Sequence, residues 1–118
     1  LKKLLELYSD KNVIKLEDIV DFHEKLEKIH PFADGNGRVG RLIVFKECLK
    51  NNIMPSIILD EYRSFYLMGL KEYDKGSKER LLETFRAGQD YSEAILKELN
   101  FQGEIKHKDI EKENELER

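Results

Sequence analysis

The sequence predicts an all-α fold. Apolar residues recur at intervals of three and four along most of the chain, which is the spacing of one helix face. The β-prone run at residues 57–59 has no second run with which to pair, so we expect it to be an apolar connection. From Gly103 onward the chain is mostly Glu, Lys and Asp, which is typical of a solvated helix or a disordered tail. We therefore expect one core domain over residues 1–102 and a charged C-terminal tail over residues 103–118.

The first two helices follow from clear patterns. Residues 1–8 carry leucines and a tyrosine at helical spacing, which indicates the last turns of an amphipathic helix. Polar turn formers at residues 9–12 predict a connection. The apolar stripe over residues 16–29 predicts a second helix. It should end there because His30 precedes Pro31, and a residue before proline avoids the α region.

Three further helices are expected beyond the loop at residues 31–37. The third should run from residue 37 or 38 to Lys50, with apolar residues on more than one face, which is typical of a central helix. Asp60 is a candidate N-cap for a fourth helix that ends near Tyr73. Ser77, after a Lys-Gly break, is a candidate N-cap for the fifth.

Composition excludes several classes of protein. At 118 residues the chain fits a single domain with a modest core. Charged residues make up 38% but nearly cancel to a net charge of −3, which offers no general attraction to nucleic acid or to an anionic membrane. Cys48 is the only cysteine, which rules out an internal disulfide and fits a reducing compartment. No apolar run reaches the length of a membrane span or signal peptide, so we expect a cytoplasmic protein.

The residues that could carry chemistry gather at residues 30–41, which read His-Pro-Phe-Ala-Asp-Gly-Asn-Gly-Arg-Val-Gly-Arg. Residues 35–40 fit the pattern G-x-G-x-x-G, but a dinucleotide-binding loop requires a preceding strand in a parallel βαβ unit. A kinase glycine loop needs a hairpin, and a P-loop needs a Lys-Ser/Thr pair. An EF-hand loop would need metal ligands where the chain has Arg38 and Phe45. These four interpretations fail.

The physical chemistry of the stretch points to phosphate. Glycines that open a helix leave backbone N–H groups approachable, and the helix dipole adds positive potential. Arg38 and Arg41 share one face of the first turns, where cations are normally disfavoured, so they imply a bound anion such as phosphate. Asp34 beside them implies Mg²⁺, and His30 is an available proton acceptor near pH 7. The alternative is a glycine-rich turn with surface arginines and a capping aspartate.

This stretch resembles, at every defining position, the Fic family motif His-Pro-Phe-x-Asp/Glu-Gly-Asn-Gly-Arg-x-x-Arg. The resemblance extends along the flanking helices, from about Leu1 to Leu99. It implies a helical bundle with the motif loop between two central helices. Most members of the family transfer AMP from ATP to a hydroxyl side chain of a target protein. The resemblance thus implies ATP as substrate, Mg²⁺ as cofactor and a protein with a reactive Tyr, Ser or Thr as partner.

The resemblance assigns roles to the first half of the motif. His30 would be the base that deprotonates the target hydroxyl. Pro31 would shape the loop, and Phe32 would anchor it in the core. Asp34 would hold Mg²⁺ against the α- and β-phosphates.

The second half would bind phosphate. Gly35, Asn36 and Gly37 would form the anion hole, Asn36 also through its side chain. Arg38 would engage the β/γ-phosphates, and Arg41 would bind the γ-phosphate or the glutamate of an inhibitory helix. The related Doc-type branch transfers phosphate and carries Lys where this chain has Gly37, so Gly37 favours nucleotidyl transfer.

Two family elements are not found in the sequence. Many members have a β-hairpin flap that docks the target. Since the chain begins at Leu1 rather than Met, we expect a truncated piece that starts after the flap. Such a piece should handle nucleotide better than it modifies a target. The inhibitory pattern Ser/Thr-x-x-x-Glu-Gly/Asn is absent, so an inhibitor lies upstream, is a separate antitoxin, or does not exist. Leu1, Leu4 and Leu5 are expected to face the core, with a homo-oligomer surface as the alternative.

Other functions stay open. Fic-type proteins can also transfer UMP, phosphocholine or phosphate, or remove AMP. A non-catalytic nucleotide-binding module is a further alternative, although such a module would not need the base His30. Outside the motif, His23 and Cys48 are expected to be core residues. The tyrosines of the fourth helix are expected to pack or face solvent, with adenine contact as the alternative, namely Tyr62, Tyr66 and Tyr73.

Overall fold

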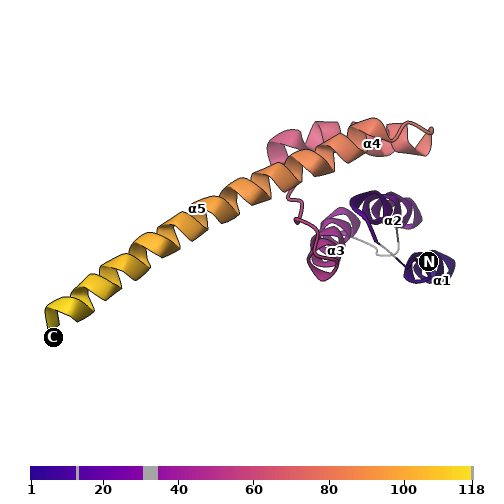
Figure 1. Cartoon of the computed structure of the whole chain (residues 1–118). Coiled ribbons are helices and arrows are strands. Elements are labelled where there is room, and N and C mark those ends of the chain that lie inside the picture. The colour runs from indigo at the N-terminus through magenta and orange to yellow at the C-terminus, as the bar shows by residue number, and fades with distance from the viewer. Residues whose placement is uncertain (13, 31–34, 118) are drawn as a thin grey trace.

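The computed structural model describes residues 1–12, 14–30 and 35–117, with side chains described as far as residue 100. The described residues form α-helices and one short 3₁₀ turn, and they contain no strand (Figure 1). In chain order these are α1 (Lys2–Ser9), α2 (Leu16–Ile29), α3 (Asn36–Lys50), the 3₁₀ turn η1 (Asp60–Tyr62), α4 (Arg63–Asp74) and α5 (Glu79–Glu117). The predicted all-α fold is confirmed.

The helix ends follow local chemistry. The carboxylate of Asp18 accepts a 2.9 Å hydrogen bond from the backbone N–H of Lys15, which stabilises the start of α2. The side-chain amide of Asn51 donates to the carbonyl of Glu47 at 2.8 Å and caps the end of α3. The expected cap at Asp60 is wrong, because Asp60 begins η1 and makes no side-chain cap bond, so α4 starts three residues later.

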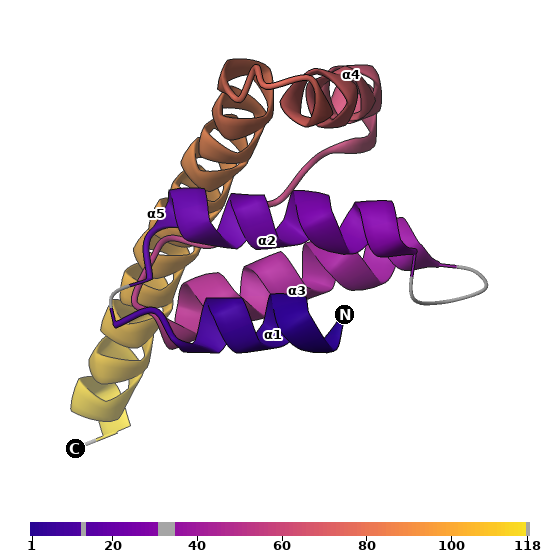
Figure 2. The same cartoon turned by 90° about the vertical axis from the view of Figure 1, so that its right-hand side faces the viewer.

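The helix α2 lies at the centre of the described fold and contacts α1, α3, α4 and α5. Figure 2 shows α1, α2 and α3 lying side by side, and both figures show α4 along the first part of α5. The prediction of a central third helix is only partly right. The helix α3 buries one side against α2 through Gly40, Val44 and Cys48, whereas Leu42 is 68% exposed on its outer side.

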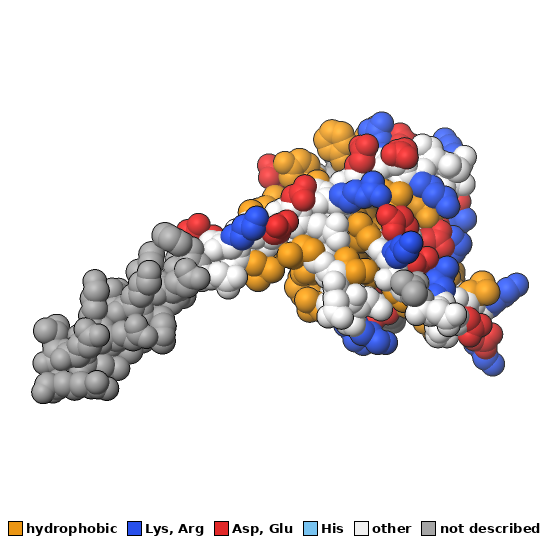
Figure 3. Space-filling view, in the orientation of Figure 1, with side chains coloured by type: hydrophobic (Ala, Val, Ile, Leu, Met, Phe, Trp, Pro, Cys, Tyr) orange, Lys and Arg blue, Asp and Glu red, His pale blue; other side chains and the backbone are white. Residues whose placement is uncertain are grey.

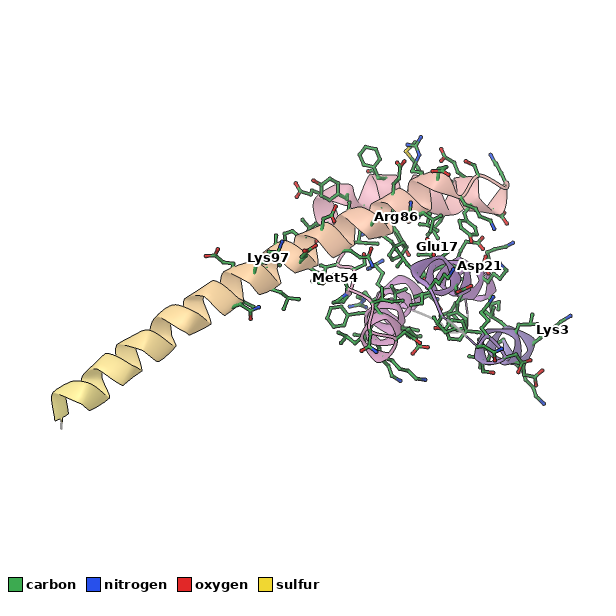
Figure 4. The ribbon with its side chains drawn as sticks, viewed as in Figure 1. Lys3, Glu17, Asp21, Met54, Arg86 and Lys97 are labelled. Carbon is green, nitrogen blue, oxygen red and sulfur yellow. The ribbon has the colours of Figure 1, made fainter. Side chains whose placement is uncertain are left out.

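The core forms where the stripe of α2 meets α3, α4 and α5. Its largest fully buried side chains come from α2, α3 and α5, namely Ile19, Val20, His23, Val44, Cys48, Leu81 and Phe85. Gly69 on α4 is needed for close approach, since a Cβ there would lie 3.0 Å from the backbone nitrogen of Leu81. An ion pair of 3.1 Å between Glu17 and Arg86 joins α2 to α5 at the surface (Figure 4).

The molecule is elongated, with principal extents of 66 × 32 × 27 Å, because α5 continues well past the other helices (Figure 1). Its backbone is helical as far as Glu117, so α5 runs through the expected tail, and the division at residue 102 stays a prediction.

Leu1 and Leu5 are about half exposed, which contradicts their expected burial. Figure 3 shows hydrophobic side chains at the surface of α4 and of the described part of α5. The exposed apolar side chains of these two helices include Phe65, Leu67, Met68, Tyr91, Leu96 and Leu99. None of the described helices combines the length and apolarity that a bilayer crossing requires.

Candidate functional site

The end of α2 sets the position of His30. Its backbone N–H donates to the carbonyl of Leu26 at 3.2 Å, and its backbone adopts the left-handed conformation with φ 48° and ψ 62°. This conformation is uncommon for a residue other than glycine, although histidine is among the residues that tolerate it. The side chain of His30 is exposed. The turn therefore stops α2 and leaves the imidazole accessible at the helix end.

The start of α3 has the features of an anion site. Its N-cap is Gly35, with φ 74°, and the helix begins at Asn36. A glycine cap offers no side-chain acceptor, and the first turn contains no acidic residue. The positive end of the helix dipole is therefore not offset by a neighbouring carboxylate of that turn.

Both motif arginines fold back over this helix start. Nη2 of Arg38 lies 3.7 Å from the place that a Cβ on Gly35 would take, and Nη1 of Arg41 lies 3.1 Å from the corresponding place on Gly37. Long side chains on a helix lean toward its N-terminus, which explains this direction. The absence of side chains at the two glycines lets both guanidinium groups approach the backbone of the first turn.

The inner arginine also contacts the core. Cζ of Arg41 lies 5.4 Å from the centre of the Tyr66 ring, within the range of a cation–π interaction. Tyr66 is only 3% exposed, and its hydroxyl is 2.5 Å from Nε2 of His23. The expected core role of His23 is confirmed, and burial together with the charge of Arg41 lowers the pKa of His23 to about 4. His23 is therefore neutral near pH 7.

The absence of a side chain at Gly40 leaves room for a carboxyl group close to this cluster. A Cβ at Gly40 would collide with Oε1 of Glu27 and would lie 2.9 Å from Cε1 of His23. Oε1 of Glu27 is buried and has no hydrogen-bond partner among the described residues. Burial raises the pKa of Glu27, while the electrostatic interactions of this group with His30 and Arg41 act in the opposite direction.

Residues 31–34 lie outside the described part of the chain, and they include three motif residues with assigned roles, namely Pro31, Phe32 and Asp34. Their assigned roles stay predictions. Among the described side chains, no group of three or more His, Cys, Asp or Glu residues is placed to hold a metal ion. Mg²⁺ at nucleotide sites is usually held by one or two carboxylates together with substrate phosphates.

Sequence reasoning missed the residues beneath the motif. The sequence predicts only that Tyr66 packs or faces solvent, and it does not single out Glu27. Gly40 is a signal for Glu27, because a glycine inside a helix weakens the helix by about 1 kcal/mol, and a closely packed neighbour is one reason to find it there. No comparable signal in the sequence points to Tyr66.

Comparisons with known proteins agree with this geometry. Residues 1–47 match the model of the Fic/DOC family, and this range includes the whole motif. The match covers less than half of the chain and shows similarity to this family over these residues. The matched segment comprises α1, α2 and most of α3.

Relatives of known name match a longer part of the chain. A probable protein adenylyltransferase of Aquifex aeolicus (strain VF5) is 32% identical over 71 residues, which are 60% of this chain and 22% of that protein. The proteins named protein adenylyltransferase Fic of Drosophila virilis and Drosophila melanogaster are 43% identical over 54 residues, which are 46% of this chain and 11% of each relative. The matched part of the chain therefore spans less than a quarter of the length of these relatives.

Proposed function

We propose that this chain carries the nucleotide site of a protein adenylyltransferase, which transfers AMP from ATP to a Tyr, Ser or Thr hydroxyl of a target protein. The observation that carries the proposal is the pair of guanidinium groups, from Arg38 and Arg41, folded over the glycine-capped start of α3. Such an arrangement suits the phosphates of a nucleotide. The names of the relatives support the choice of adenylyl transfer over other phosphate chemistry.

In this mechanism, the target hydroxyl attacks the α-phosphorus of ATP. The new P–O bond forms to the target oxygen, the bond from the α-phosphorus to the bridging oxygen breaks, and pyrophosphate leaves. His30 accepts the hydroxyl proton. Its exposed position at the end of α2 leaves it open to a protein substrate.

The remaining residues would neutralise charge. Arg38 and Arg41 would bind the phosphates that leave, and the backbone of Gly35, Asn36 and Gly37 would receive the oxygens of the transferred group. Asp34 would hold Mg²⁺, which would offset the negative charge of the phosphates. Catalysis would come mainly from in-line positioning and from this charge neutralisation.

Gly37 favours this reaction over phosphate transfer. A side chain at this position would begin 3.1 Å from Nη1 of Arg41. A lysine there, as in the Doc-type branch, would add a second positive charge against that guanidinium group. The glycine keeps Arg41 over the first turn of α3.

The test uses the purified protein, Mg²⁺ and a cell lysate, with ATP labelled at the α-phosphate or at the γ-phosphate. Label transferred from the α position alone, and lost in His30→Ala, supports AMP transfer. The variant Arg38→Ala should lose the label, whereas Arg63→Ala, which removes an exposed arginine on α4, should keep it.

Other outcomes contradict the proposal in specific ways. Label from the γ position alone would assign the protein to the phosphate-transferring branch. No transfer from either position, together with ATP binding that survives His30→Ala, would favour a binding module without catalysis.

A further inference from the structure

The guanidinium group of Arg41 links the core to the proposed phosphate site. One of its nitrogens lies against Gly37 in the first turn of α3, and its Cζ lies over the ring of Tyr66 on α4. Arginine side chains are flexible and lose conformational entropy when they are fixed. A guanidinium group that already rests on a fixed ring loses less of this entropy when a phosphate binds.

The ring of Tyr66 is fixed from several sides. Its hydroxyl is 2.5 Å from Nε2 of His23, and its ring meets Phe85 edge to face, with centroids 6.2 Å apart. His23 in turn meets Phe85 edge to face at 5.3 Å. All three side chains are at most 3% exposed. These contacts from α2 and α5 hold the aromatic face on which Arg41 rests.

The charges around Tyr66 favour a cation at this place. His23 is neutral near pH 7 because burial and the charge of Arg41 both lower its pKa. Burial raises the pKa of the Tyr66 hydroxyl, the nearby Glu27 raises it further, and Arg41 lowers it. Among the described residues, the cluster therefore contains one cation, Arg41, one acidic group, Glu27, and the uncharged ring of Tyr66.

We propose that Tyr66 is a positioning residue, which holds the Arg41 guanidinium group over the first turn of α3 so that it is ready to receive a nucleotide phosphate. The inference rests on the proposed function, because it assumes that Arg41 binds phosphate. Tyr66 does not touch the nucleotide in this account. It acts only through Arg41.

The test measures binding of Mg²⁺-ATP by calorimetry in a double-mutant cycle. Tyr66→Leu should raise the Kd about fivefold, which corresponds to the loss of one cation–π contact. The same substitution in the background of Arg41→Ala should cause no further change, since its effect requires the guanidinium group. Tyr66→Phe keeps the ring and should bind Mg²⁺-ATP nearly as well as the unchanged protein.

Tyr73→Leu is the matched control. Tyr73 is also a buried tyrosine on α4 with a cation over its ring, since Nζ of Lys78 lies 5.6 Å from the ring centre. Its substitution should lower stability without raising the Kd. A Tyr66→Leu protein that binds like Tyr73→Leu, while Arg41→Ala binds weakly, would overturn the inference and leave the proposed function intact.

Two further outcomes are informative. If Arg41→Ala binds Mg²⁺-ATP as tightly as the unchanged protein, the phosphate role of Arg41 fails, and the inference fails with it. If Tyr66→Leu does not fold, the NMR signal of the Arg41 side chain in the unchanged protein replaces it. An upfield ring-current shift of that signal, and its movement on addition of Mg²⁺-ATP, would support the inference, and the absence of both would overturn it.

Discussion

The hydroxyl of Ser56 donates a 2.7 Å hydrogen bond to the backbone carbonyl of Phe85. Ser56 is 6% exposed and lies in the connection between α3 and η1, whereas Phe85 lies on α5. Next to this bond, the N–H of Ile57 donates to the carbonyl of Gly88 at 3.2 Å. These two hydrogen bonds join the connection to α5. The same helix carries Phe85, whose ring packs against Tyr66 and His23.

Removal of this buried bond should destabilise the fold. Ser56→Ala leaves the carbonyl of Phe85 without this side-chain donor, and we expect the free energy of unfolding to fall by about 1 kcal/mol. Urea unfolding followed by circular dichroism measures this change. Ser9→Ala is the matched control, because the hydroxyl of Ser9 also donates to a backbone carbonyl, that of Glu6 at 3.1 Å, but is exposed. Equal losses in the two variants would contradict a special role for the buried bond.

The neutral state of His23 predicts a loss of stability in acid. Its pKa is lowered from an ordinary value of 6.5 to about 4 in the folded protein, so between these values the unfolded chain binds more protons. Stability attributable to His23 is therefore present above pH 6.5 and is lost as the pH falls toward 4. The shift corresponds to about 3 kcal/mol at most.

The measurement compares urea unfolding at pH 7 and pH 4.5 for the unchanged protein and for His23→Gln, which does not titrate. Burial raises the pKa of Glu24 and Glu27, so their contribution to the free energy of unfolding increases as the pH falls, opposite to that of His23. Both glutamates are present in the unchanged protein and in the variant, so their contributions cancel in the comparison. The unchanged protein should lose more stability on acidification than the variant. Parallel losses would show that His23 is not held neutral by its burial.

Removal of Mg²⁺ should weaken nucleotide binding. If Asp34 and the phosphates share the metal, a chelator should raise the Kd for ATP, and Asp34→Asn should reduce the difference between ATP with and without Mg²⁺. Calorimetry with and without a chelator measures both. Asp60→Asn, an exposed aspartate in η1, is the control and should keep the full Mg²⁺ effect. An unchanged Mg²⁺ effect in Asp34→Asn would remove Asp34 from the metal site.

Much of the fold could be predicted because local signals fix it. The stripe of α2 and the His30-Pro31 pair predicted the bounds 16–29, which the structure confirms. Local patterns do not say which helices are neighbours, however. The outer side of α3 looked like a buried face, yet Leu42 is exposed there because, among the described helices, α3 packs mainly against α2.

The candidate site also has one part that the sequence predicts and another part that only the fold reveals. Its phosphate-binding character follows from glycines and arginines that are neighbours in sequence, and these could be read directly. The support under Arg41 could not, because Tyr66 lies 25 residues further along the chain and reaches the site only through the packing of α4. Distant contacts of this kind depend on the tertiary fold, and the helical Gly40 indicates in advance only the close approach of α2, not that of Tyr66.

A substitution at Gly37 should separate stability from binding. Its φ is not in the left-handed region, so Gly37→Ala suits the first turn of α3 and should keep or slightly raise the free energy of unfolding. The new Cβ would lie 3.1 Å from Nη1 of Arg41, so the guanidinium group would have to shift by a few tenths of an ångström from its place over the helix start. We expect the Kd for Mg²⁺-ATP to rise about tenfold, as for one weakened charge-assisted hydrogen bond. Lys46→Ala, at an exposed position of α3, should change neither quantity. Tight ATP binding by Gly37→Ala would show that the close approach of Arg41 to this turn is not needed for the nucleotide.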